Sequence, residues 1–130
     1  MYLILIKILI AEDSLLLNKL LVSTIEKAGF KYKTTMNGQE AYDYINSING
    51  KISDEIQCII TDIEMPEMDG LTLSKKIKDD KTMNDIPIIV FSSLINEALK
   101  RKCESLNIDA MIAKPEIGLL INKIKELLNK

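Results

Sequence analysis

The sequence contains no histidine among its 130 residues. This absence excludes Ser-His-Asp and Cys-His nucleophiles and any metal site with imidazole ligands. The chemistry of the chain must therefore depend on carboxylates, hydroxyls and lysine. Cysteine is also sparse, because Cys58 and Cys103 are the only two and lie too far apart in sequence to form a metal-binding pair. Such usage favours a reducing, cytoplasmic location.

Strong net charge and long apolar runs are missing as well. The net charge is −2, which gives no electrostatic basis for binding nucleic acid or an anionic membrane. The longest apolar run, Met1 to Ile6, resumes at Ile8 to Ala11 and is too short to span a bilayer. It also lacks the basic start and the cleavage site of a signal peptide. We therefore expect no nucleic-acid partner and no membrane partner.

Length and composition predict one globular domain. A chain of 130 residues with 47% apolar and 28% charged residues can bury a core without disulfides. We assign this domain to residues 7–130. Residues 1–6 fit the pattern poorly, and we interpret them either as an extension of the first strand or as the remnant of a linker in a longer protein. We favour the linker remnant.

Short apolar strands alternate with amphipathic helices along the chain. This order predicts a doubly wound α/β fold, in which five helices flank a parallel sheet of five strands. The predicted strands are about Leu5–Ala11, Lys31–Thr35, Gln57–Thr61, Pro87–Phe91 and Ala110–Ala113. The predicted helices are about Leu15–Ala28, Ala41–Ile48, Leu71–Lys78, Leu99–Leu106 and Ile117–Leu127. The polar stretch from Asn49 to Glu55 is interpreted as a loop.

Chemically active residues follow the inner strands. Glu12 and Asp13 come after the first strand, Asp62 after the third, Ser92 after the fourth and Lys114 after the fifth. We expect them to share a pocket, because the carboxyl ends of parallel strands meet at one edge of the sheet. Three adjacent carboxylates repel one another unless a cation lies among them, and oxygen ligands favour Mg²⁺. With an ammonium and a hydroxyl, such a site suits a phosphoryl group, and a carboxylate can act as its nucleophile.

Each of these residues has an ordinary explanation when it is taken alone. An acidic residue after a strand is usually a solvated loop residue, and Ser92 or Lys114 alone would be a turn hydroxyl or a surface lysine. Four independent strand ends with matching chemistry favour the functional interpretation.

The motifs also resemble those of a known family. The matching stretches are Glu12-Asp13, Asp62 to Gly70, Ser92 after Val90-Phe91, and Lys114-Pro115. Together they resemble the receiver domain of two-component response regulators, the CheY-like fold, over about residues 7–130. The resemblance implies the strand order 2-1-3-4-5. The finer similarity is to receivers of CheV-type chemotaxis coupling proteins, in which a CheW-like domain precedes the receiver. It lies in Glu12–Leu17, Phe91–Glu97 and Ile112–Ile117.

The resemblance implies a role for each acidic residue. Asp62 would accept a phosphoryl group from a phosphohistidine on a CheA-like sensor kinase, so the missing histidine would be supplied in trans. Asp13 and Asp62 would bind Mg²⁺ or Mn²⁺ directly. The main-chain carbonyl of Glu64 would be a third ligand, and Glu12 would act through water.

The resemblance also assigns the remaining strand ends and shows departures from the usual pattern. Ser92 and Lys114 would hold phosphoryl oxygens, and the peptide bond after Lys114 would be cis. Ser92 replaces a more frequent threonine and keeps the hydroxyl. Met111 stands where an aromatic switch residue is usual, and Leu94 where polar residues are common. These two positions and Glu64 would modulate switching and hydrolysis of the phosphoryl group.

Three functions are compared. The favoured one is a phosphorylation-controlled interaction module, or a phosphate sink, whose only enzymology is uptake and loss of the phosphoryl group. The second is a Mg²⁺-dependent phosphatase of the haloacid dehalogenase kind, whose signature is Asp-x-Asp. Asp62-Ile63-Glu64 only nearly matches this signature, and the sequence shows no cap domain to close over a substrate. A pseudo-receiver that never takes up phosphate is disfavoured by the intact Asp62 and Lys114.

Overall fold

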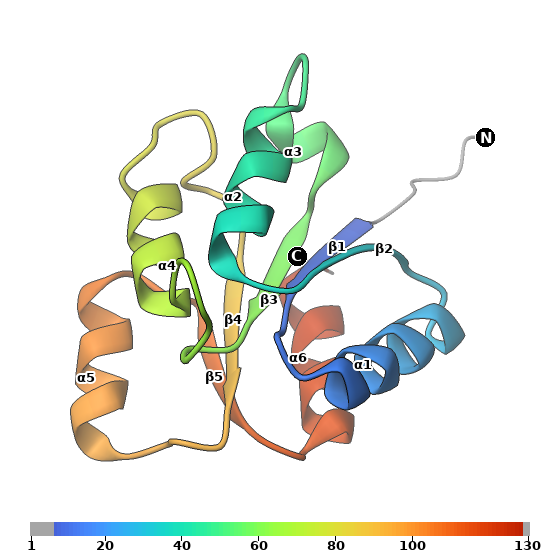
Figure 1. The fold of residues 1–130 in the computed structure, drawn as a ribbon, viewed down its shortest axis with the longest axis vertical. Coiled ribbons are helices and arrows are strands. Elements are labelled where there is room, and N and C mark those ends of the chain that lie inside the picture. Colours follow the sequence, from blue (N-terminus) through green and yellow to red (C-terminus); the bar gives the residue numbers. More distant parts are fainter. Residues whose placement is uncertain (1–6, 129–130) are drawn as a thin grey trace.

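A computed structural model describes residues 7–128, in which five parallel strands form one sheet between two layers of helices (Figure 1). The strands are β1 (Lys7–Ala11), β2 (Lys31–Thr35), β3 (Cys58–Thr61), β4 (Ile88–Ser92) and β5 (Ala110–Ala113). Their order is β2-β1-β3-β4-β5. The predicted fold class and strand order are therefore confirmed. The predicted start of the first strand and the interpretation of residues 1–6 lie outside the described residues.

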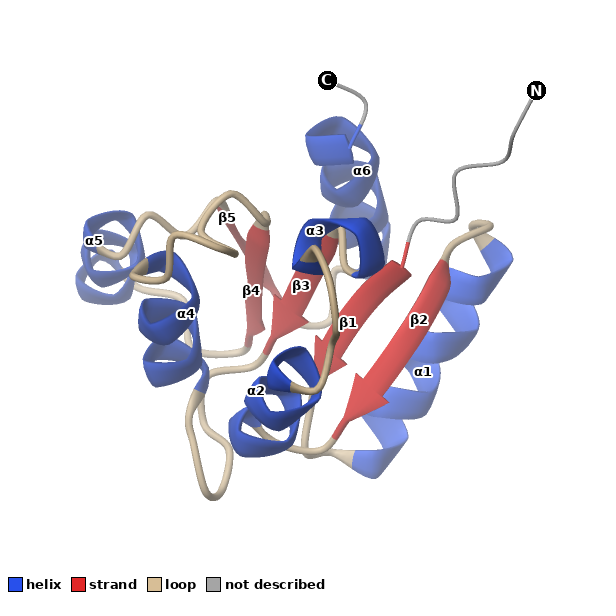
Figure 2. Cartoon of the chain, turned by 90° about the horizontal axis from the view of Figure 1, so that it is seen from above, coloured by secondary structure: helices blue, strands red, loops and turns tan. Residues whose placement is uncertain are grey.

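Helices cover both faces of the sheet (Figure 2). They are α1 (Leu15–Lys27), α2 (Gly38–Asn46), α3 (Ile52–Glu55), α4 (Gly70–Lys78), α5 (Glu97–Ser105) and α6 (Ile117–Leu128). Successive side chains of a strand point to opposite faces, so Ile8 and Ile10 of β1 pack against residues of α1 and α6. Leu9, between them, packs against residues of α2 and α4. The inner strands β1, β3 and β4 are mostly apolar because both of their faces are buried.

Between residues 7 and 128 the structure contains one more helix than the five predicted. Helix α3 occupies Ile52–Glu55, inside the stretch that was interpreted as a loop. It has a single turn, and such a segment is too short to show helical periodicity in the sequence. Ile52 packs against the core cluster below α2 and α4, so tertiary packing holds this turn in place.

The helix starts follow from capping residues. Ser14 caps α1 by accepting a hydrogen bond from the Leu17 amide at 3.3 Å, and Asp69 caps α4 by accepting from the Thr72 amide at 2.7 Å. Both side-chain oxygens thus satisfy a backbone amide in the first turn of their helix. Strand β4 begins one residue later than predicted and includes Ser92 as its last residue.

Both cysteines are part of the core. Cys58 and Cys103 are unpaired and buried. Burial raises the pKa of the Cys58 thiol to about 12, which makes it a structural residue rather than a nucleophile. None of the helices within residues 7–128 has the length and apolar character needed to span a bilayer.

Candidate functional site

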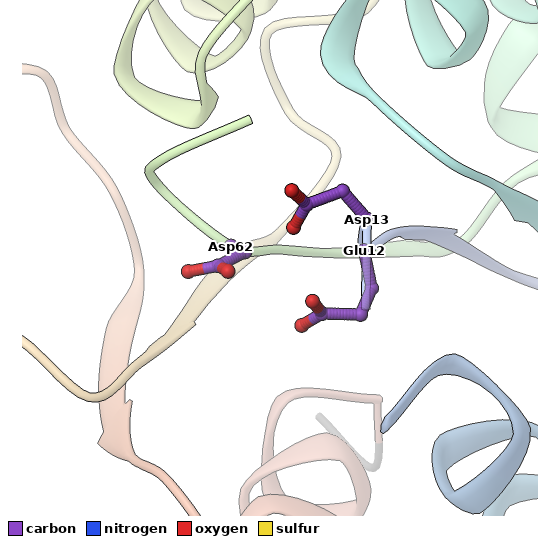
Figure 3. A group of neighbouring side chains, drawn as sticks. All are labelled: Glu12, Asp13 and Asp62. Atoms are coloured by element: carbon purple, nitrogen blue, oxygen red, sulfur yellow. The ribbon is translucent and has the colours of Figure 1, made fainter. Parts of the chain in front are cut away.

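Three carboxylates meet at the carboxyl edge of the sheet. Glu12 and Asp13 follow β1, Asp62 follows β3, and these two strands are paired neighbours. A carboxylate oxygen of each residue lies within 4.8 Å of an oxygen from the other two (Figure 3). Glu12 is buried, Asp62 is partly exposed and Asp13 is exposed, so the cluster runs from the interior to the surface. The structure thus brings together the three carboxylates that follow β1 and β3, and their role as a site stays a prediction.

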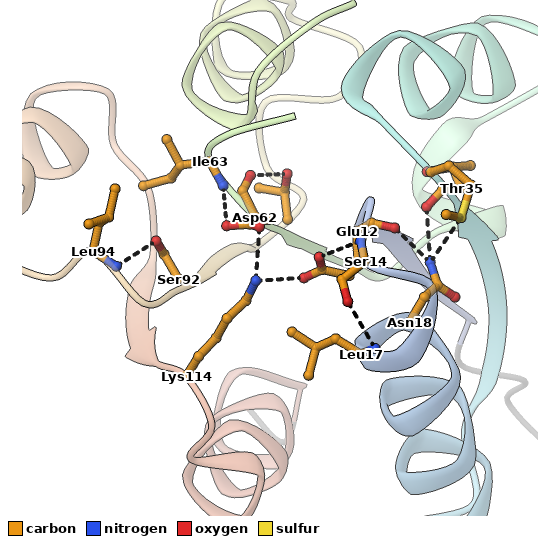
Figure 4. A network of polar contacts seen from close by, with 12 residues as sticks. Glu12, Ser14, Leu17, Asn18, Thr35, Asp62, Ile63, Ser92, Leu94 and Lys114 are labelled. Atoms are coloured by element: carbon orange, nitrogen blue, oxygen red, sulfur yellow. Dashed lines mark hydrogen bonds and ion pairs between the residues drawn. The ribbon is translucent and has the colours of Figure 1, made fainter. Parts of the chain in front are cut away.

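Lys114 connects two of these carboxylates. Its Nζ lies 2.8 Å from Oδ2 of Asp62 and 3.0 Å from Oε1 of Glu12 (Figure 4). The lysine follows β5, and the chain is positioned there by a hydrogen bond from the Lys114 amide to the Ser92 carbonyl at 2.9 Å. The Lys114-Pro115 bond is cis, as the resemblance implied. One ammonium thus partly balances the negative charge of the site.

Burial and the neighbouring charges shift the pKa values of Glu12 and Lys114. Desolvation raises the pKa of Glu12, and this effect outweighs the hydrogen bond from the Ser14 amide and the attraction of Lys114. Desolvation also opposes the charged form of Lys114, but hydrogen bonds and the charges of Asp62 and Glu12 together raise its pKa above the usual value. Lys114 is therefore firmly protonated, and Glu12 holds a proton more readily than an exposed glutamate does.

The backbone around Asp62 is tightly constrained. The Asp62 amide donates to the Ala11 carbonyl at 3.0 Å, and Oδ1 of Asp62 accepts from the Ile63 amide at 2.7 Å. A Cβ atom on Gly70 would collide with the Asp62 carbonyl oxygen and come within 2.9 Å of Oγ1 of Thr61. Glycine at the start of α4 therefore allows the helix to pack directly against the residue that presents the carboxylate.

The other predicted residues surround this centre at different depths. Ser92 is buried, and its Oγ accepts a hydrogen bond from the Leu94 amide at 3.0 Å. The Leu94 side chain and Glu64 are exposed on the two loops that border the site. Met111 is half-buried on β5 and packs against the cluster of Ile63, Val90 and Cys103. The functional roles assigned to these residues remain predictions.

One polar residue near the site was not identified from the sequence. Asn18 of α1 is buried, and its side-chain amide donates to the carbonyls of Glu12 and Thr35. The spacing of the helix could have identified it. Asn18 lies three residues before Leu21 and seven before Ile25, and is therefore on the buried stripe of α1. A polar residue on such a stripe needs a hydrogen-bond partner in the interior.

The donor set fits a hard divalent cation. Three carboxylates supply the oxygen ligands that Mg²⁺ and Mn²⁺ prefer, and their mutual repulsion favours a cation among them. Oε1 of Glu12 is buried and, within the described residues, receives no well-directed hydrogen bond, although the Lys114 ammonium lies near it. An acceptor in this state is available to a cation or to a water molecule bound to one.

Comparisons with known proteins assign the family. The family model described as the response regulator receiver domain matches residues 8–125. Chemotaxis protein CheV2 of Helicobacter pylori is 31% identical over 122 residues, which are 94% of this chain and 38% of the relative. The polar-differentiation response regulator DivK of Brucella anthropi is 30% identical over 122 residues, 93% of this chain and 94% of the relative. The chain belongs to the receiver domain family of response regulators.

Solved structures agree with the fold. The receiver domain of the sensor histidine kinase PA1611 from Pseudomonas aeruginosa has a TM-score of 0.83 and 16% identity, and the match covers 97% of this chain and 99% of that chain. That structure is described with a magnesium ion coordinated in its active-site cleft. The chain spans less than two-fifths of the CheV2 relative, since the match covers 38% of it.

Proposed function

We propose that Asp62 is the phosphoacceptor of a two-component signalling receiver. The observation that carries this proposal is the bridge of Lys114 between Asp62 and Glu12, beside a third carboxylate, Asp13. Asp62 is the member of the cluster that is both partly exposed and bonded to the lysine. An oxygen of Asp62 attacks the phosphorus of a phosphohistidine, the P–N bond breaks, and the leaving imidazole takes a proton. The product is an aspartyl phosphate.

The residues around Asp62 are placed to support this transfer. The Lys114 ammonium would turn from Asp62 and Glu12 toward a phosphoryl oxygen. There it would stabilise the negative charge that develops during transfer. Ser92 accepts a hydrogen bond from the Leu94 amide, so its own hydroxyl hydrogen is free to be donated to a second oxygen. Asp13 and Asp62 would hold a divalent cation, with the Glu64 carbonyl as a further ligand and Glu12 acting through water. Such a cation would supply positive charge to the phosphoryl group.

The relatives support a chemotaxis kinase as the donor. Two of the similar proteins are chemotaxis proteins CheV2 and CheV1 of Helicobacter pylori, and each is about three times as long as the matched region. We propose a CheA-like histidine kinase as the partner and a CheW-like domain before residue 7 in the full-length protein, with residues 1–6 as part of the connection. On this proposal the protein acts in the cytoplasm, as a signal or as a phosphate sink.

Mass spectrometry of the purified protein tests the proposal. Incubation with phosphoramidate and Mg²⁺ should add one phosphoryl group, and the addition should disappear in Asp62→Asn and in excess EDTA. Equal labelling with EDTA, or labelling of Asp62→Asn at the parent level, would contradict the mechanism. Turnover of p-nitrophenyl phosphate, measured in the same preparation, would instead identify a phosphatase; we expect none above the level of Asp62→Asn.

A further inference from the structure

Asn18 is the centre of a buried polar network beside the acidic cluster. Its side chain is 4% exposed. The amide nitrogen donates to the carbonyl oxygen of Glu12 at 3.0 Å and to that of Thr35 at 3.2 Å, and it lies 3.7 Å from the sulfur of Met36. The amide oxygen accepts from the hydroxyl of Thr34. Figure 4 shows this network on the side of the cluster away from Lys114.

The network leaves one orientation for the Asn18 amide. Two carbonyl oxygens require donors on one side, and the Thr34 hydroxyl, which donates, requires an acceptor on the other. The Thr35 carbonyl also accepts from the Glu12 amide at 3.1 Å. Helix α1, the end of β2 and the turn after β1 are thus tied together through one side chain. Its loss would leave the Glu12 carbonyl without the donor that Asn18 supplies, whereas the Thr35 carbonyl would keep the Glu12 amide.

We propose that Asn18 is a positioning residue for the divalent cation. It holds the Glu12 carbonyl, which belongs to the peptide unit that joins Glu12 to Asp13, so the amide fixes where both carboxylates point relative to Asp62. Groups that orient metal ligands without touching the metal commonly change its affinity by about 10-fold to 100-fold when they are removed. The inference concerns the cation site that the proposed function uses, and Asn18 itself does not contact the phosphoryl group.

The test compares Asn18→Leu with a matched core variant. Asn18→Leu keeps the volume of the side chain and removes both donors, whereas Ile25→Val weakens the packing of the same helix and leaves the network intact. Calorimetric titration with Mg²⁺ alone should show an affinity at least about 10-fold lower in Asn18→Leu and unchanged within twofold in Ile25→Val. In the metal-free proteins, hydrogen exchange of the Glu12 amide should be faster in Asn18→Leu only.

A second variant keeps the test decisive if Asn18→Leu does not fold. Thr34→Val removes the hydroxyl that orients the amide, and it should weaken Mg²⁺ binding in the same direction but less. Parent-like Mg²⁺ affinity in the folded Asn18 variant, or in Thr34→Val if that is the one that folds, would overturn the inference. An equal loss in Ile25→Val would overturn it too, because the effect would then be one of general stability. Phosphoryl uptake is not part of these readouts, so failure of Asp62 labelling would refute the proposed function separately.

Discussion

The ammonium of Lys114 lies 2.8 Å from Oδ2 of Asp62, across 52 positions of sequence. The same nitrogen is 3.0 Å from Oε1 of Glu12, so one cation is shared between two carboxylates from neighbouring strands. On the function proposed above, the lysine neutralises the accepting carboxylate before transfer. During transfer, the same charge would stabilise the phosphoryl oxygens, which would gain negative charge.

We expect Lys114→Met to lose phosphoryl uptake while it still binds Mg²⁺. The variant lacks the charge that stabilises the transferring group, and comparable losses elsewhere cost about 10²-fold to 10³-fold in rate. Mg²⁺ affinity should be equal or higher, because the ammonium repels a second cation. Uptake from phosphoramidate and calorimetric titration measure the two quantities. Lys78→Met is the control, since Lys78 is also largely buried and paired with Asp109 but lies outside the site; a similar loss of uptake there would contradict the assignment.

We expect Glu12→Gln to stabilise the metal-free protein at neutral pH. The pKa of Glu12 is raised by burial, so the folded protein holds this proton more tightly than the unfolded chain, and ionisation of Glu12 costs stability as the pH rises above the ordinary value of 4.5. The glutamine variant avoids this cost. Its melting temperature should exceed that of the parent at pH 7, and the difference should vanish below about pH 4.

Asp80→Asn is the matched control for that pH dependence. Hydrogen bonds from Thr82 lower the pKa of Asp80, so its ionised form favours folding and the contribution is lost as the pH falls. Asparagine at this exposed position should therefore give no gain at pH 7. Thermal unfolding followed by circular dichroism from pH 3 to pH 8 measures both variants. A Glu12→Gln advantage that persists unchanged at low pH would contradict the burial argument.

We expect Gly70→Ala to damage the site and Gly118→Ala to strengthen the fold. The new methyl group on residue 70 would collide with the Asp62 carbonyl and force the phosphoacceptor loop to move, at a cost of about 1–3 kcal/mol. The methyl group on residue 118 meets nothing within 4 Å and removes a flexible glycine from α6, which should gain up to about 1 kcal/mol. Urea unfolding and phosphoramidate labelling should separate the two variants; normal labelling of Gly70→Ala would refute the constraint.

We expect Met111 to make the conformational response weak on the β5 side. Met111 is half-buried against Val90 and Cys103, and its flexible side chain adapts to either arrangement of this cluster with little energetic preference. A small difference in energy between two states gives a small shift in population. Beryllofluoride should therefore change NMR shifts strongly around Asp62, Ser92 and Lys114 but modestly beyond Met111. Met111→Tyr should enlarge the distal changes, and full-amplitude changes through α6 in the parent would contradict this.

The sequence was sufficient for the sheet and for the meeting of the carboxylates. Both follow from regular alternation of strands and helices, because parallel strand ends must share one edge. Helix α3 was missed since a single turn has no period, and packing of Ile52 decides its conformation. The direction of a long side chain is also beyond sequence patterns. The bridge of Lys114 between Asp62 and Glu12 depends on backbone positions far away in sequence. The direction of the Asn18 amide depends on the end of β2 as well as on the nearby Glu12.

On the proposed function, the packing around Gly38 and Gly70 would limit which parts of the chain move after phosphorylation. The Gly38 amide donates to the Met68 carbonyl at 3.0 Å, and the Gly70 amide donates to the Ile63 carbonyl at 2.8 Å, so the loop after β3 is fastened at both of its ends. These two hydrogen bonds restrain the loop on the α2 and α4 side of the site. A phosphoryl group on Asp62 would therefore cause little movement of this restrained loop. The conformational change would then occur at the end of β4. There the Ser92 hydroxyl is held by the Leu94 amide two residues away, and it could turn to a phosphoryl oxygen.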